Sequence, residues 1–219
     1  PVAEKYYKDV WTTKVHLKKG YTSIYEFSWE DYYIYMLVHL AKHIKLGGSG
    51  IRSIIDIKIF LDKKKEELNW DYVKEELKKL HLSQFEYWMR QLSEVWFGTE
   101  KTAPLYDELT EFIVDSGTYG TIKNYHASHV VELGGKNQNL SVGKIRSKLE
   151  IIFLPYEGMQ EQYLYLEKFP FLLPVAWIQR IFRTIVWRKD KITSTLQSTN
   201  IEQDRLEKVK KVMDALELF

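Results

Sequence analysis

Cysteine is absent from this sequence: none of the 219 residues carries a thiol. Disulfide bonds, thiolate catalysis and zinc sites built from cysteine are therefore excluded. An excess of either charge is also absent, since 32 Lys and Arg oppose 30 Asp and Glu and leave a formal net charge of +2. Such a balanced chain lacks the broad basic character of general nucleic-acid binders, so we expect no nucleic-acid partner.

Long apolar runs and targeting signals are missing as well. No apolar stretch approaches the roughly 18 residues that a membrane-spanning helix requires, and no signal peptide is recognisable. We therefore predict a cytoplasmic protein. The chain begins with Pro1 rather than with methionine, inside sequence typical of a helix, so we expect it to be a fragment of a longer protein.

Helical spacing of apolar residues dominates the chain. It predicts a mainly α fold, a bundle-like array of helices with at most a short extended segment near residues 21–27. Ser28, Asn69 and Ser83 are expected to cap the helices that follow them. The linker-like residues 134–139 predict a soft boundary between a domain of residues 1–133 and an extension of residues 134–219. After an N-terminal helix or arm over residues 1–15, the expected helices cover residues 29–45, 51–64, 70–80, 83–97, 104–114, 122–133, 142–154, 157–168, 175–188 and 200–219.

The most distinctive stretch is residues 32–61, which predict two helices joined by a Gly-Gly-Ser-Gly loop. An i, i+4 spacing places His39 and His43 on one face of the first helix, and Arg52 and Asp56 on one face of the second. A different face of the first helix is expected to enter the core through Tyr33, Leu37, Leu40, Ala41 and Ile44. The second helix is expected to face inward through Ile51, Ile54, Ile55 and Leu61.

The histidine pair raises the question of a metal site. Two imidazoles one turn apart, with Asp56 from the neighbouring helix, are a possible ligand set for zinc or a similar ion and would define a metal-dependent hydrolase. The glutamate of an H-E-x-x-H protease motif is absent, however, and Lys42 lies beside the pair. We therefore favour a structural role for the histidines and predict no metal ligands.

Arg52 and Asp56 have two interpretations. They can form an intrahelical ion pair, although the order with the basic residue first is the weaker one. Alternatively, Arg52 can face a partner or a phosphate. The glycine-rich loop at residues 47–50 leads into a helix N-terminus, but its spacing fits neither a P-loop nor a dinucleotide fingerprint, so a plain helix–helix turn is favoured. No G-x-S-x-G occurs either, so we expect no nucleophile elbow for acyl transfer.

Residues 169–189 form the third candidate segment. An apolar run there contains Trp177 and Trp187, together with four basic residues, Arg180, Arg183, Arg188 and Lys189. Such a segment can lie on a membrane surface or dock against a protein partner. It can also bury its apolar face in the core while its arginines reach the solvent, and we favour this second interpretation.

From about Asp9 to Phe97 the sequence resembles the C-terminal part of an uncharacterised bacterial nucleotidyltransferase family. The H-L-A-K-H run at residues 39–43 and the G-I-R-S-I-I-D-I run at residues 50–57 carry most of the resemblance. Further matching residues are Glu30-Asp31-Tyr32 and Asn69-Trp70-Asp71, with weaker similarity at residues 116–120 and 170–174.

The resemblance implies a polymerase-β-type reaction, in which carboxylates on a small mixed sheet hold Mg²⁺ while a nucleoside monophosphate passes from an NTP to an acceptor. This chain has no Asp-x-Asp motif and no alternating strands. We therefore expect the catalytic core to lie upstream of Pro1. No catalytic residue is predicted in this chain, because the catalytic positions of the family that it resembles are absent. On this view the fragment is inactive alone and does not by itself hold the Mg²⁺ and NTP of the full-length enzyme.

The family resemblance also makes His39, His43, Arg52 and Asp56 candidates for contacting substrate or nucleotide, although they can equally well brace the helices. The alternative function is a non-enzymatic helical interaction module that docks a protein partner or a membrane surface through residues 169–189.

Overall fold

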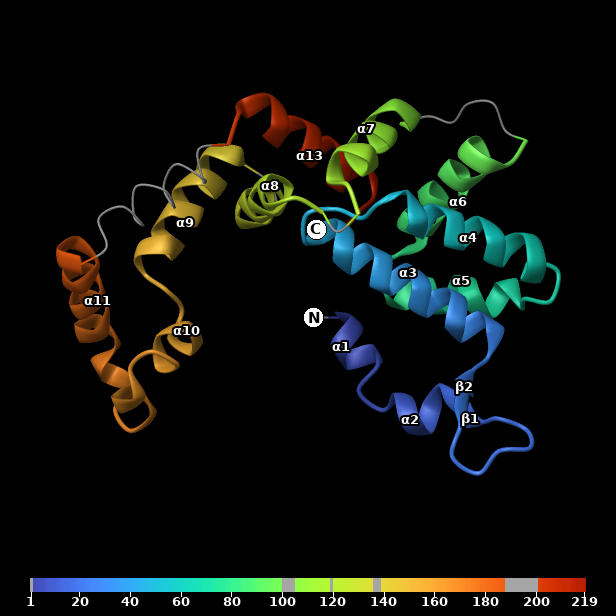
Figure 1. The fold of residues 1–219 in the computed structure, drawn as a ribbon, viewed down its shortest axis with the longest axis horizontal. Coiled ribbons are helices and arrows are strands. Elements are labelled where there is room, and N and C mark those ends of the chain that lie inside the picture. Colours follow the sequence, from blue (N-terminus) through green and yellow to red (C-terminus); the bar gives the residue numbers. More distant parts are fainter. Residues whose placement is uncertain (1, 100–104, 119, 136–138, 188–200) are drawn as a thin grey trace. The chain divides into compact units, whose positions relative to one another are not determined.

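The computed structural model of the chain describes residues 2–99, 105–118, 120–135, 139–187 and 201–219. The mainly α fold expected from the sequence is confirmed, and the described strands form a small two-stranded sheet (Figure 1). In chain order the elements are α1 (Val2–Tyr6), α2 (Val10–Thr13), β1 (Val15–Leu17), β2 (Tyr25–Phe27), α3 (Trp29–Lys45), α4 (Ile51–Lys64), α5 (Trp70–Lys79), α6 (Ser83–Phe97), α7 (Tyr106–Ser116), α8 (Ile122–Leu133), α9 (Leu140–Ile152), α10 (Tyr156–Gln160), the 3₁₀ turns η1 (Leu164–Glu167) and η2 (Pro170–Leu172), α11 (Leu173–Trp187) and α13 (Gln203–Ala215).

The chain divides into two compact units. The first comprises residues 1–125 and 208–219, and the second comprises residues 126–207. The C-terminal residues belong to the first unit because Val209, Val212 and Leu216 are buried and because Lys208 donates to Glu111 of α7 at 2.7 Å. This division falls inside α8, whereas the boundary expected from the sequence lies at 133/134.

The first unit is built around α3, which packs against α5, while α4 packs along α6. Every residue of the core stripe expected on α3 is buried. Two of the three expected caps are present: the Ser28 side chain accepts from the backbone N–H of Asp31, and that of Asn69 accepts from Tyr72. These local signals explain why α3 begins and ends at the residues expected from the sequence. The expected cap at Ser83 is wrong, because Ser83 is the first residue of α6 and Leu82 is its N-cap, without a side-chain hydrogen bond.

The inward face of α4 was predicted only in part. Ile54 and Leu61 are buried as expected, but Ile51 is 44% exposed and the buried set also includes Ile57 and Phe60. The first turn of α4 therefore lies at the surface, and its central turns carry the packing against α6.

The N-terminal segment differs from the expected helix or arm. It forms the two short helices α1 and α2 and then the strand β1, which pairs antiparallel with β2 in the register Val15↔Phe27, His16↔Glu26 and Leu17↔Tyr25. The extended segment expected near residues 21–27 is thus a strand only over its last three residues. Strand β1 was not predicted, because three residues carry too little periodicity to be recognised without their partner.

The glycine loop between α3 and α4 is a packed turn. Gly47 and Gly48 adopt φ values of +113° and +114°. A Cβ at Gly48 would lie 1.9 Å from Ser116 Oγ, and one at Gly50 would lie 2.6 Å from the carbonyl oxygen of Gly117. The loop is buried beneath residues 116–118 and 120–121, which supports the favoured interpretation of a helix–helix turn over that of an open anion cradle.

The second unit has its own small core. Met159, Leu166 and Ala176 are fully buried, with Leu172, Leu173 and Trp177 among the residues packed around them. The single helix expected over residues 157–168 is instead split into α10 and η1, and the Tyr156 hydroxyl donates across the split to the carbonyl of Leu166 at 2.8 Å. No helix in the described parts of either unit is both long enough and apolar enough to cross a membrane.

Candidate functional site

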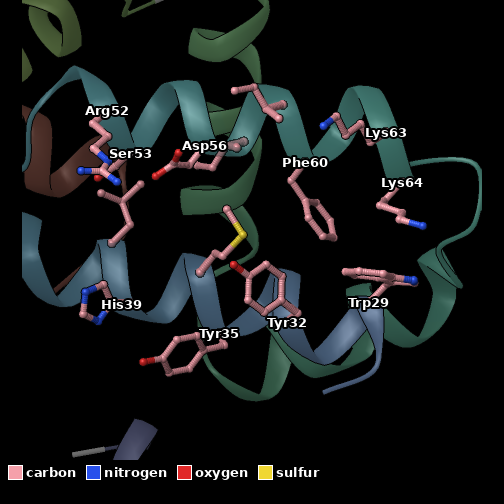
Figure 2. A pocket seen from close by; sticks show the side chains of 14 residues that line it. Trp29, Tyr32, Tyr35, His39, Arg52, Ser53, Asp56, Phe60, Lys63 and Lys64 are labelled. Atoms are coloured by element: carbon pink, nitrogen blue, oxygen red, sulfur yellow. The ribbon is translucent and has the colours of Figure 1, made fainter. Parts of the chain in front are cut away.

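A pocket of about 590 Å³ opens between α3 and α4 in the first unit (Figure 2). Its lining combines aromatic rings with charged groups, which is the mixture that small-molecule sites use to hold and orient a ligand. The aromatic residues are Trp29, Tyr32, Tyr35 and Phe60. The polar and charged residues are His39, Arg52, Ser53, Asp56, Lys63 and Lys64.

Helical spacing brings these side chains together. On α3, residues 29, 32, 36 and 39 recur at intervals of three or four, and so do residues 52, 56, 60 and 63 on α4. Figure 2 shows the two rows on facing helices, with the Phe60 ring between them. His39 thus belongs to the row on α3, and Arg52 and Asp56 belong to the row on α4, whereas His43 does not line the pocket.

Arg52 and Asp56 share this pocket but do not pair with each other. Both are exposed, and no ion pair or side-chain hydrogen bond joins either of them to any residue that the structure describes. The intrahelical ion pair considered for this spacing is therefore not formed. Their charges remain available to a ligand, and solvent rather than protein balances them.

The two histidines contact each other, but only one lines the pocket. Their Nε2 atoms lie 2.9 Å apart, a hydrogen bond that requires one ring to donate and the other to accept. Partial burial, together with the nearby His39 and Lys42, lowers the pKa of His43. The ring of His39 also stacks on Tyr35 with centroids 6.0 Å apart. Through this hydrogen bond, His43 orients the ring of His39, which lines the pocket.

The structure offers no ligand set for the metal-dependent hydrolase. Within the described ranges, no group of three or more His, Cys, Asp and Glu side chains is placed to hold a metal ion. His39 and Asp56 come from opposite helices of the pocket, and the imidazoles of His39 and His43 are hydrogen-bonded to each other.

Lys63 and the aromatic residues were not among the candidates expected from the sequence. Lys64 already has two interaction partners, since its Nζ lies 4.3 Å above the Trp29 ring and 2.9 Å from Glu67. Lys63 has no such partner among the described residues. Its position three residues after Phe60 was the available signal, but a run of charges at a helix end is ordinarily read as solvated.

A second polar cluster lies in the same unit. Lys14 Nζ is 2.8 Å from Glu76 and 3.2 Å from Asp31, and it also donates to the Tyr72 hydroxyl at 2.8 Å. Burial opposes ionisation of Glu76, but hydrogen bonds from Lys14, Lys79 and Tyr6 outweigh it and lower the pKa of Glu76 to about 2. Because every charge has a partner, this cluster ties the N-terminal segment to α3 and α5 rather than forming a site.

The comparisons with known proteins concern this same unit. Residues 1–98 match the model of a family described as an uncharacterised nucleotidyltransferase, which confirms the resemblance found in the sequence. This part of the chain is therefore similar to that family, and it contains both the pocket and the Lys14 cluster. No significant match was found among curated proteins or among solved structures.

Proposed function

We propose that the pocket between α3 and α4 contacts a nucleotide and that this helical region serves a nucleotidyltransferase reaction. The observation that carries the proposal is the pair of uncompensated cations, Arg52 and Lys63, beside exposed aromatic rings and within the residues that match the family. Neither a packed core nor an ordinary solvated helix face requires this combination.

The pocket offers a separate contact for each part of a nucleotide. A guanidinium such as that of Arg52 binds phosphate oxygens through two parallel hydrogen bonds, and Lys63 adds a point charge. Tyr32 is 42% exposed, so a base can stack on its ring, whereas the Tyr35 ring already stacks on Phe27 and His39. The volume of about 590 Å³ lies within the roughly 300–1,000 Å³ typical of small-molecule sites.

The residues that line the pocket are not a suitable ligand set for Mg²⁺. Among the residues that the structure describes, Asp56 is the only carboxylate that lines the pocket, whereas the metal-assisted transfer implied by the family requires several carboxylates around its ions. We therefore assign no metal-dependent step to this chain. Our proposal is that the catalytic carboxylates and Mg²⁺ belong to another part of a cytoplasmic enzyme, and that this region supplies contacts to the nucleotide.

A ligand titration tests the proposal. ATP with Mg²⁺ should raise the melting temperature of the chain, because a ligand that binds the folded state stabilises it by mass action. Arg52→Ala should abolish that shift, whereas the matched control Arg183→Ala, which removes an exposed arginine of the other unit, should retain it. Adenosine alone and tripolyphosphate alone should each bind more weakly than ATP. Absence of any shift, or an equal shift in Arg52→Ala, would refute the proposal.

A further inference from the structure

One face of α11 is apolar and exposed. Phe171, Val175, Ile178 and Phe182 follow one another at intervals of three or four, so they share one face of the segment formed by η2 and α11. Phe171, Ile178 and Phe182 are 75%, 67% and 70% exposed. We call these four residues the α11 stripe. A contiguous apolar patch of this kind is typical of an interaction site.

The opposite face of α11 is held by its own unit. Ala176 is fully buried in the small core, and the Trp177 indole N–H donates to the carbonyl of Leu154 at 2.9 Å. Arg180 donates to the carbonyls of Ile151 and Ile152, each at 2.9 Å. Turning the α11 stripe inward would break all of these contacts. The interpretation of residues 169–189 as core is thus right for one face of the helix and wrong for the other.

Within residues 168–189 the charged side chains are all basic, although Glu167 and Asp190 flank this segment. From residue 168 to residue 189 the sequence contains no Asp or Glu, but it contains Lys168, Arg180, Arg183, Arg188 and Lys189. Arg183 is exposed, and Arg188 and Lys189 lie outside the described residues. A second copy of the chain would bring like charges together at this face, which opposes association. An anionic lipid surface complements both the apolar side chains and the basic ones.

We propose that the α11 stripe lies on an anionic lipid surface. Phe171, Ile178 and Phe182 enter the boundary between headgroups and acyl chains, and the exposed Lys168 and Arg183 supply positive charge for the lipid phosphates. The helix lies parallel to the membrane plane, because its other face stays attached to the second unit. This inference concerns a different unit from the nucleotide pocket and does not depend on it.

Vesicle flotation with the full chain tests this proposal. The probe is phosphatidylcholine vesicles with about 30 mol% phosphatidylserine, compared with phosphatidylcholine alone. The chain should float with the anionic vesicles only, and about 0.5 M NaCl should weaken the binding through screening. Ile178→Ser should lower the partition coefficient about five- to tenfold, since it removes a large apolar side chain from the interface.

Ile122→Ser is the matched control, because it makes the same substitution at a 74% exposed isoleucine of α8. It should float as the unmodified chain does, and circular dichroism should show equal helix content in both variants. Three results would overturn the proposal. These are no flotation with anionic vesicles, equal flotation with both kinds of vesicle, or a dimer in solution that Ile178→Ser dissociates, which would assign the stripe to a second copy of the chain.

Discussion

Replacing Gly48 by alanine should destabilise the first unit in two separable ways. The first is backbone strain, because φ is +114° and side-chain-bearing residues rarely adopt that value. The second is steric overlap, because the new Cβ would lie 1.9 Å from Ser116 Oγ and 2.3 Å from Ser116 Cβ. Both neighbouring atoms belong to a buried residue at the end of α7, so they cannot move aside freely.

The two contributions can be separated with a second glycine. Gly20 also has a positive φ, +86°, but no atom lies within 4 Å of its hypothetical Cβ. Gly20→Ala should therefore cost only the strain, about 1–3 kcal/mol. Gly48→Ala should cost that strain plus about 1–3 kcal/mol for overpacking. The expected difference of about 1–3 kcal/mol is a large part of a total stability on the order of 5–15 kcal/mol.

Urea unfolding followed by far-UV circular dichroism measures both losses, with the free energy taken from linear extrapolation. The double variant Gly48→Ala with Ser116→Gly should show a favourable coupling energy of about 1 kcal/mol or more, since it removes the clashing atoms. If Gly48→Ala and Gly20→Ala lose equal stability, or if the coupling is zero, the contact with Ser116 is not the reason for glycine at this position.

Three further predictions concern the same unit. Glu76→Gln should lower the free energy of unfolding by about 1–3 kcal/mol at neutral pH, because it weakens hydrogen bonds to a charged group. The pKa of Glu76 falls from 4.5 to about 2 on folding, so its contribution is fully present above pH 4.5 and is lost as the pH falls toward 2. Urea titrations across this range should show the gap between variant and wild type narrowing, and a constant gap would contradict this assignment. Asn69→Ala should cost about 1 kcal/mol by the same assay, whereas Asn69→Ser should keep most of the cap, and equal losses would argue against capping. Tyr32→Leu should weaken ATP binding about fivefold in calorimetry if a base stacks there, while the exposed control Tyr21→Leu should not.

Local signals in the sequence were sufficient for the central helices. The expected range of α3 agrees with the structure at both ends because Ser28, the apolar stripe and the following glycines all act within a few residues of one another. The same reasoning missed β1, whose three residues become a strand only through pairing with β2. It also placed Ile51 inside, because periodicity gives the direction of a helix face but not the residue at which packing begins.

The candidate site was likewise predicted from local sequence in part, and the rest of it depends on contacts between residues far apart in the sequence. Spacing alone correctly put Arg52 and Asp56 on one face, and the family resemblance singled out His39 on the neighbouring helix. That these faces meet in a pocket depends on how α3 and α4 pack, which no short motif encodes. For this reason Tyr32, Tyr35 and Lys63 were not predicted, although they lie at helical intervals from residues that were.

The motifs that carry the family resemblance fall into two groups according to whether their polar atoms are satisfied within the unit. Asp31 contacts Lys14 and Tyr72, and the Glu30 carboxylate accepts from the backbone N–H of Asn69 at 2.9 Å, so these residues join α3 to α5 and need no ligand. Arg52 and Asp56 have no comparable contacts among the described residues, although both occupy the wall of a pocket. A fold does not require charged side chains that stabilise nothing within it. Under the function proposed above, this second group is the one that contacts the nucleotide.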